Sequence, residues 1–154
     1  MRSKTFTVTG VLGTVAALAL VTGCSTTPAK LDVSTLFSNW NAALATGDAD
    51  KVADLYAPDA VLLPTVSDKV RTNRADIVDY FKHFLENKPS GTIENEVVNV
   101  LDEDTAVNTG VYRFALATDG KTQEVRARYT FVYELRDGKW LIVNHHSSAM
   151  PGKA

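Results

Sequence analysis

The sequence predicts an α+β domain in which a curved antiparallel sheet wraps around N-terminal helices. Three observations favour this class. Apolar residues recur at helical spacing in two segments before residue 89, and the chain has strand character from residue 92 to residue 148. Two Asp-Gly pairs mark hairpin turns between the last three strands. Helices gathered before a run of strands are typical of α+β domains, whereas regular alternation would predict a parallel sheet.

Two amphipathic helices account for the apolar spacing in the first half. One begins after a cap at Asp32 and ends before Gly47, and the other begins near Asn73 and ends before Pro89. Each presents an apolar stripe along one face. The stripes are Val33, Leu36, Phe37, Trp40 and Leu44 in the first helix, and Ile77, Tyr80, Phe81, Phe84 and Leu85 in the second.

Between these helices, the sequence predicts a short helix and a short strand. Asp48 is placed to cap the helix, which carries Tyr56 and is ended by Pro58. The strand covers Ala60–Leu63. After Gly91, four longer strands are expected at residues 92–101, 105–118, 121–135 and 139–148.

The N-terminus has the features of an export signal. Arg2 and Lys4 precede nineteen uncharged residues, a length that also approaches the roughly 20 residues of a membrane span. The segment VTGC, which ends at Cys24, resembles the lipobox of bacterial lipoproteins, where the cysteine is acylated after cleavage. We therefore expect a signal peptide at 1–23, a tether at 24–30 and one domain at 31–151. The mature protein would be exported and anchored to a membrane through lipid on Cys24.

The charge balance and the cysteine count exclude two features, nucleic-acid binding and an internal disulfide. Loss of residues 1–23 would leave 14 basic residues against 18 acidic ones, a formal charge of −4. This balance argues against nucleic acid, whose binding relies on clustered excess Lys and Arg. Cys24 is the only cysteine, so the domain holds together without an internal disulfide.

Two stretches carry a family resemblance. NAALATGDADKVADLYAPDAVLLP, residues 41–64, resembles the opening of the nuclear transport factor 2 and ketosteroid isomerase superfamily, the SnoaL-like cone. DGKWLIVNHHSSAMP, residues 137–151, resembles the end of the association domain of calcium/calmodulin-dependent protein kinase II and of its bacterial stand-alone relatives. The resemblance implies a cone-shaped, cystatin-like fold with a cavity between helix and sheet, and assembly through the sheet into dimers or larger rings. The kinase itself is absent from this sequence.

The two adjacent histidines near the end of the chain are expected to have different roles. If the second Asp-Gly pair forms a two-residue turn, Tyr129 faces His146 and Phe131 faces Asn144. Neighbouring strand residues point to opposite faces, so His146 would join the inner aromatic face and His145 the outer one. This alternation argues against one metal ion held by both histidines, and no metal site is predicted. A bulge in the hairpin would reverse these assignments.

Three arginines are predicted to gather on one face of the sheet. Counting across the first Asp-Gly pair places Arg113 opposite Arg126 and next to Arg128. The face is either a solvated or acid-paired surface, or an anion site or oligomer contact. The resemblance implies a position for Arg113 in the cavity, whereas a second cavity arginine of the kinase domain corresponds to Phe131. An unchanged carboxylate-binding pocket is therefore not expected.

The preferred function is an oligomeric, lipid-anchored domain that binds a small polar or acidic molecule in its conical pocket. Such a pocket is concave and mostly apolar, with a few converging polar groups. The candidates are Tyr56, Arg113, Tyr129, Asn144 and His146.

Two alternatives remain open: a SnoaL-like or ketosteroid isomerase-like enzyme, and a module that only assembles. The isomerase reaction requires a carboxylate base in the cavity. Leu63-Pro64 stands where the isomerase carries that base, and Asp59 lies nearer the strand start. No catalytic residue and no cofactor are predicted.

Overall fold

The computed structural model of the protein describes residues 32–65, 67–118 and 120–152. Its elements all belong to one compact unit, Leu31–Ala154, and the predicted signal peptide, Cys24 and tether lie outside the described residues. In the described part, no helix has the length and apolar character needed to cross a membrane. The elements in chain order are α1 (Val33–Ala45), α2 (Ala49–Ala53), β1 (Tyr56–Leu63), α3 (Arg74–Leu85), β2 (Ser90–Val100), β3 (Thr105–Thr118), β4 (Lys121–Arg136) and β5 (Lys139–Ala149).

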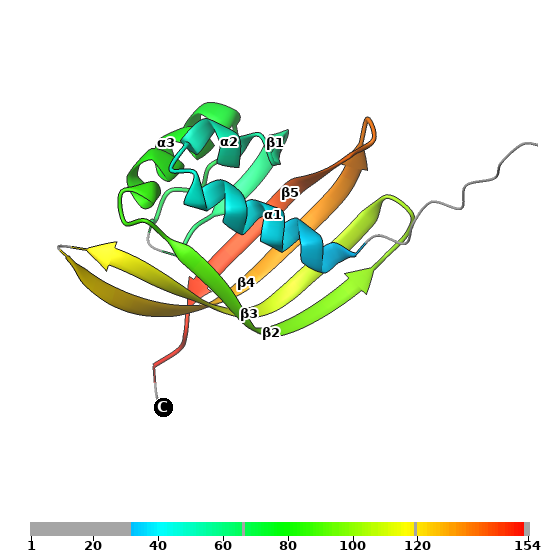
Figure 1. Ribbon diagram of the computed structural model, residues 1–154. Helices are drawn as coiled ribbons and strands as arrows, with labels where there is room; N and C mark the ends of the chain where they lie inside the picture. The colour runs from blue at the N-terminus through cyan, green and yellow to red at the C-terminus, as the bar shows by residue number, and fades with distance from the viewer. Residues whose placement is uncertain (1–31, 66, 119, 153–154) are drawn as a thin grey trace, which may run out of the picture. The chain divides into compact units, whose positions relative to one another are not determined.

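The five strands form one curved sheet in the order β1-β5-β4-β3-β2 (Figure 1). Strands β2 to β5 pair antiparallel, as predicted. Strand β1 adds a parallel edge beside β5, which the sequence did not predict. Helix α1 crosses the concave side of the sheet, while α2 and α3 lie together near β1. We call the side that faces α1 the inner face and the opposite side the outer face.

The helices begin where capping predicts. The Asp32 carboxylate accepts a hydrogen bond from the Ser34 amide at 3.1 Å, and Asp48 and Asn73 cap α2 and α3 in the same way. Such caps satisfy backbone N–H groups that have no partner within the helix. The predicted caps at Asp32 and Asp48 are confirmed, and Asn73 caps the helix that was expected to begin near it.

The apolar stripe of α1 packs against the inner face of the sheet. The rings of Trp40 and Phe131 lie 5.3 Å apart at an angle of 67°, and Phe37 contacts Tyr112 and Tyr129. All five side chains are buried. Burying one large apolar side chain contributes roughly 1.5–3 kcal/mol, so this layer of rings supplies much of the folding free energy.

The predicted position of Tyr56 on a helix is wrong. Helix α2 ends at Ala53, and Tyr56 is the first residue of β1. The Ile142 amide donates to the Leu55 carbonyl at 2.8 Å, which begins the pairing of this segment with β5. Pro58 does not stop the strand because β1 is at the edge of the sheet, where a missing N–H donor is tolerated.

A bulge in β5 reverses the predicted facing of the two histidines. Pairing runs from the hairpin turn to Tyr133 opposite Ile142, and then resumes with Val132 opposite Asn144. Val143 is therefore an extra residue, and every later side chain of β5 changes face. His145 is buried on the inner face with 3% exposure, whereas His146 is exposed on the outer face. The predicted pairing of Tyr129 with His146 is wrong, since Tyr129 faces Ser147.

The hairpin between β3 and β4 has no such shift. Arg113 lies opposite Arg126, as predicted, although Asp119 of the turn lies outside the described residues. Arg113 forms ion pairs with Glu94 and Glu124, and Arg126 pairs with Glu94 at 2.7 Å. For these two arginines, the acid-paired reading of the surface is confirmed.

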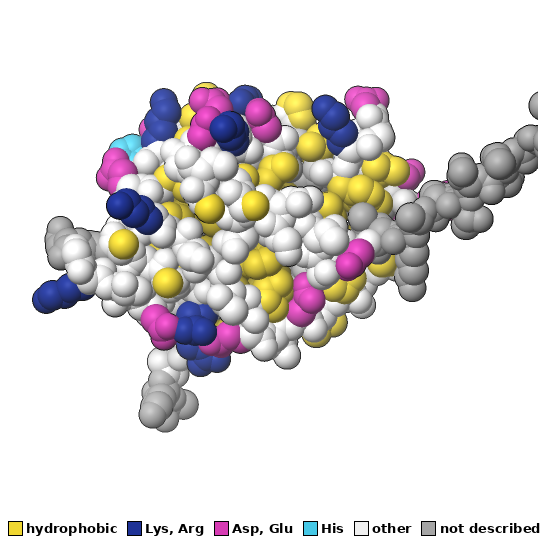
Figure 2. Space-filling model, in the orientation of Figure 1, with side chains coloured by type: hydrophobic (Ala, Val, Ile, Leu, Met, Phe, Trp, Pro, Cys, Tyr) yellow, Lys and Arg dark blue, Asp and Glu magenta, His cyan; other side chains and the backbone are white. Residues whose placement is uncertain are grey.

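Charged side chains of both signs are also mixed over α2 and α3 (Figure 2). Arg74 of α3 contacts Asp50 at 3.0 Å and Asp54 at 2.8 Å. These groups are exposed, so such pairs contribute little to stability, about 0–1 kcal/mol each. The charges of α2 and α3 therefore lie on the surface, whereas the core is rich in aromatic side chains.

Candidate functional site

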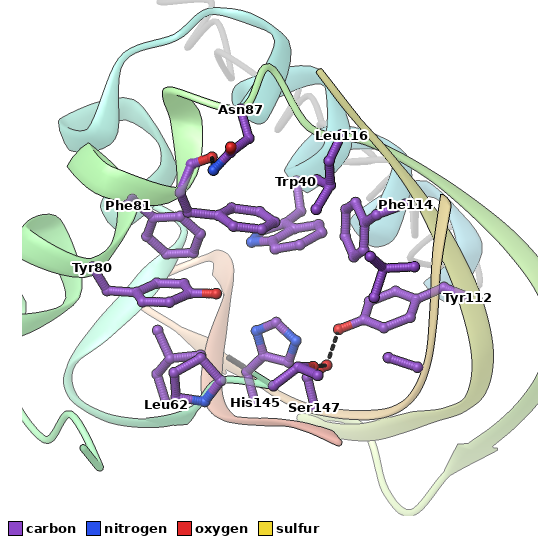
Figure 3. Close-up of a pocket in the computed structure, with 15 residues that line it drawn as sticks. Trp40, Leu62, Tyr80, Phe81, Asn87, Tyr112, Phe114, Leu116, His145 and Ser147 are labelled. Atoms are coloured by element: carbon purple, nitrogen blue, oxygen red, sulfur yellow. Dashed lines mark hydrogen bonds between the residues drawn. The ribbon is translucent and has the colours of Figure 1, made fainter. Parts of the chain in front are cut away.

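A cavity of about 200 Å³ lies between α1, α3 and the inner face of the sheet. Its walls are mostly apolar, and most of its large side chains are aromatic (Figure 3). The lining residues are Trp40, Leu62, Pro64, Thr65, Tyr80, Phe81, Phe84, Asn87, Tyr112, Phe114, Leu116, Val125, Ala127, His145 and Ser147. No Asp, Glu, Lys or Arg is among these described residues. The cavity has the size and character of a site for a small organic molecule.

His145 is the most unusual residue of the lining. Its ring stacks on Phe131 with the centroids 4.0 Å apart and 22° between the planes. Trp40 meets it edge-on at 5.4 Å and 88°. Figure 3 shows the His145 ring between Tyr80 on one side and Tyr112 on the other. A polar ring thus lies among aromatic groups that offer it few hydrogen bonds.

A chain of hydrogen bonds fixes which nitrogen of His145 carries the proton. The Trp40 indole N–H donates to the Tyr56 hydroxyl at 3.1 Å, and that hydroxyl lies 2.8 Å from Nδ1 of His145. If Tyr56 donates its proton to Nδ1, every group in the chain has a partner. The opposite arrangement would leave the Tyr56 proton buried without an acceptor. The network therefore favours the tautomer in which Nε2 of His145 carries the hydrogen.

Burial keeps His145 neutral. Burial, together with a smaller effect of the neighbouring His146, lowers the pKa of His145 to about 3. A charged imidazolium would lose its hydration in this apolar site without a carboxylate to compensate. Near neutral pH, His145 is therefore an uncharged hydrogen-bond donor.

Nε2 of His145 is buried and has no hydrogen-bond partner within the described structure. An unsatisfied buried polar group costs about 1–3 kcal/mol. Native structures contain few unpaired buried polar groups, and each of them needs an explanation. Here, a hydrogen bond to a bound molecule would explain the unpaired N–H. The unpartnered N–H is therefore the strongest sign of a binding site in the described part of the chain.

Hydroxyl groups form a second polar feature of the wall. Tyr112 donates to the Ser147 hydroxyl at 2.5 Å, and Ser147 also shares a hydrogen bond with Thr65. Burial raises the pKa of Tyr112, and it raises the pKa of Tyr80 to about 12 even though the Arg71 cation acts in the opposite direction. Both phenols are therefore protonated at neutral pH, and neither can act as a base.

Of the predicted pocket residues, two lie on the inner side of the sheet without lining the cavity. Tyr56 stands behind His145 and orients it through the hydrogen bond to Nδ1. Tyr129 is buried, and its hydroxyl donates to Asn108 at 2.9 Å. Tyr56 supports the site indirectly, while Tyr129 belongs to the core.

The predicted cavity positions of Arg113, Asn144 and His146 are wrong. Asn144 and His146 follow the Val143 bulge and face outward. Arg113 alternates with the inward-facing Tyr112 and lies in its ion pairs on the outer face. The cavity therefore has no arginine to attract an acid.

Several lining residues were not selected from the sequence as site residues, although their elements were predicted. Trp40, Tyr80, Phe81 and Phe84 belong to the apolar stripes of the helices, and a stripe does not reveal where packing leaves a gap. His145 was missed because it was placed on the wrong face. No local feature of the sequence marks the bulge that reverses its facing, so no sequence signal identified His145 as an inner residue.

The site lacks the carboxylate that an isomerase-type reaction requires. Leu62 and Pro64 line the cavity where β1 ends, and Asp59 lies on the exposed part of that strand. The Arg136 guanidinium donates to Asp59 and holds the pKa of its carboxyl below the usual value. Asp59 is therefore a surface ion-pair partner.

The buried His145 predicts a pH dependence of stability. Its folded pKa, about 3, lies below the unfolded value of about 6.5, so the unfolded state binds more protons between these values. The free energy of unfolding should fall as pH drops from 6.5 to 5, by up to about 1.4 kcal/mol per pH unit. Urea titrations should show this slope reduced in His145→Gln and retained in His83→Gln, an exposed control. Equal slopes in His145→Gln and the wild type would contradict a buried neutral histidine.

The architecture recurs in solved structures of low sequence identity. A nuclear transport factor 2-like protein with a cystatin-like fold from Novosphingobium aromaticivorans is 16% identical, with a TM-score of 0.66, over 79% of this chain and 82% of that chain. A nuclear transport factor 2-like family protein from Streptomyces avermitilis, proposed to be a dehydratase, is 15% identical with a TM-score of 0.69, over 78% and 95%. These similarities show the fold.

A closer similarity shows the family. A Xanthomonas campestris protein assigned to the calcium/calmodulin dependent protein kinase II association domain is 61% identical, with a TM-score of 0.77, over 80% of this chain and 91% of that chain. A comparison with curated proteins finds no match. Residues 29–151 match the family described as calcium/calmodulin dependent protein kinase II association domain. The chain belongs to the calcium/calmodulin dependent protein kinase II association domain family.

Proposed function

We propose that this chain is a self-assembling, membrane-tethered domain that binds a small organic molecule in the cavity between α1, α3 and the sheet. The observation that carries the binding proposal is the unpartnered Nε2 of His145 in an aromatic cavity of about 200 Å³. Such a combination of apolar walls and a few polar groups is typical of ligand sites.

Binding explains the geometry better than catalysis does. His145 is neutral, and its Nδ1 already accepts a hydrogen bond from Tyr56, so neither nitrogen is free to take a proton. The described lining contains no carboxylate, and its phenols are protonated. General acid–base chemistry requires a group whose pKa lies near the working pH, and these residues do not supply one.

Ligand binding can be tested with two small probes, ethylbenzene and acetophenone. Residues 31–154 form a suitable protein, because this range is one compact unit and this chain covers 91% of the Xanthomonas chain, which was crystallised. Ligand-observed NMR should detect binding of at least one probe. Val125→Trp, which fills the cavity, should weaken binding at least about tenfold, while Val98→Trp, on an exposed part of β2, should not. Failure of both probes to bind the wild type would refute the binding proposal.

Self-assembly is proposed through the outer face of the sheet. The described helices lie on the inner side, so no described element covers the opposite side (Figure 1). The outer face is partly apolar and is hollowed where Thr109, Val111, Arg128 and Thr130 lie together. An uncovered sheet face of this kind favours contact with a second copy, in keeping with membership of an association-domain family.

Light scattering tests this assembly. Residues 31–154 should form at least a dimer at micromolar concentration. Val111→Arg places a cation at the centre of the outer face and should shift the protein toward monomer. Val70→Arg makes the same change at an exposed site before α3 and should leave assembly unchanged. A wild-type domain that stays monomeric at high micromolar concentration would rule out the proposal.

Membrane tethering is proposed from the sequence of the N-terminal segment. The lipobox-like VTGC would place acyl chains on Cys24, and more than one chain is needed for stable anchoring. Cells given labelled palmitate should incorporate it into the full chain and not into Cys24→Ala. Equal labelling of both proteins would contradict the proposal.

A further inference from the structure

His145, which lines the cavity, carries a buried hydrogen-bond donor that has no partner in the described structure. The tautomer favoured by the Trp40, Tyr56 and His145 chain leaves the N–H at Nε2 without an acceptor. A ligand that only donates hydrogen bonds would meet another donor at this point. A ligand with an acceptor atom would satisfy the buried N–H.

The neighbouring hydroxyls reinforce this preference. Tyr112, Ser147 and Thr65 carry three protons between them, and their two mutual hydrogen bonds use two. One hydroxyl proton is left for a further acceptor. The three hydroxyls and His145 all belong to the lining of the cavity, and His145 and Ser147 are two residues apart on the inner face of β5 (Figure 3).

The walls select an apolar body for the ligand. Trp40, Phe81 and Phe114 present ring surfaces to the cavity, and Leu62 and Leu116 add aliphatic surface. The space, about 200 Å³, is similar to that of cavities that hold one substituted benzene ring. A planar or compact apolar group therefore fits, and a larger polar molecule does not.

The absence of charge in the described lining selects against ions. A carboxylate in this cavity would lose its hydration and gain no cation from the lining residues. Arg71 lies outside the lining, with its guanidinium 5.1 Å from the centroid of the Tyr80 ring, and it donates to Ser67 and to the Lys69 carbonyl. Arg71 contacts the lining residue Tyr80 but does not itself line the cavity.

We infer that the ligand is an uncharged apolar molecule with a carbonyl-type hydrogen-bond acceptor, and that Nε2–H of His145 is the group that recognises this acceptor. The inference rests on the proposed binding function and specifies its chemistry. It also assigns Tyr56 and Trp40 a positioning role, because their hydrogen bonds favour the tautomer that carries the hydrogen on Nε2.

Three probes of similar shape test the inference: ethylbenzene, acetophenone and benzoate. Ethylbenzene has no hydrogen-bond acceptor, but it is also more hydrophobic than acetophenone, which changes its absolute affinity. We therefore compare the ratio of the acetophenone affinity to the ethylbenzene affinity between the wild type and each variant. This ratio should fall about tenfold, or about 1.4 kcal/mol, between wild type and His145→Phe. His145→Phe alone leaves the buried Tyr56 hydroxyl without its acceptor and could therefore fold poorly. The Tyr56→Phe/His145→Phe double variant removes that hydroxyl as well, and the affinity ratio should fall by the same factor in it. Benzoate at pH 7 should bind at least about a hundredfold more weakly than acetophenone.

The outcomes separate this inference from the binding function. An unchanged ratio in both variants would overturn recognition by His145 while leaving ligand binding intact. Tight binding of benzoate would overturn the selection against anions. If neither acetophenone nor ethylbenzene binds, both the function and the inference are refuted.

Discussion

One extra residue in β5, Val143, determines which side chains reach the cavity. Without it, strand alternation would carry Asn144 and His146 inward and leave His145 on the outer face. With it, His145 and Ser147 face α1, and the outer face receives the exposed His146. A single bulge thus shifts the register of the later part of β5 by one residue. The shift decides which polar side chains of this strand line the cavity.

The properties of the site depend on the position of His145 among aromatic side chains. Stacking on Phe131 and the perpendicular contact with Trp40 bury the imidazole away from water, which keeps it neutral. The Tyr56 hydroxyl then decides which nitrogen is protonated. Burial and one hydrogen bond together convert a residue that ordinarily titrates near neutral pH into a fixed donor. The cost is an unsatisfied N–H in the described structure, which a ligand can offset.

Much of the fold could be predicted from the sequence, because its determinants are local. The helix caps at Asp32, Asp48 and Asn73, the spacing of Phe37 and Trp40 and the Asp-Gly turns act within a few residues. The site could be predicted less well from the sequence. The bulge at Val143 has no glycine or other local mark, and the parallel pairing of β1 depends on contacts with the last strand. The cavity itself is space left between elements distant in sequence, so apolar spacing could not reveal it.

The central claim is that His145 is an inward-facing, neutral donor, and the protonation state of its ring tests that claim most directly. Long-range ¹H–¹⁵N correlation NMR on residues 31–154, assigned with His145→Gln, reports which nitrogen of each histidine carries hydrogen. The account predicts the Nε2–H form of His145 at pH 7, unchanged at pH 5. An imidazolium at pH 5, or an Nδ1–H form at pH 7, would contradict it.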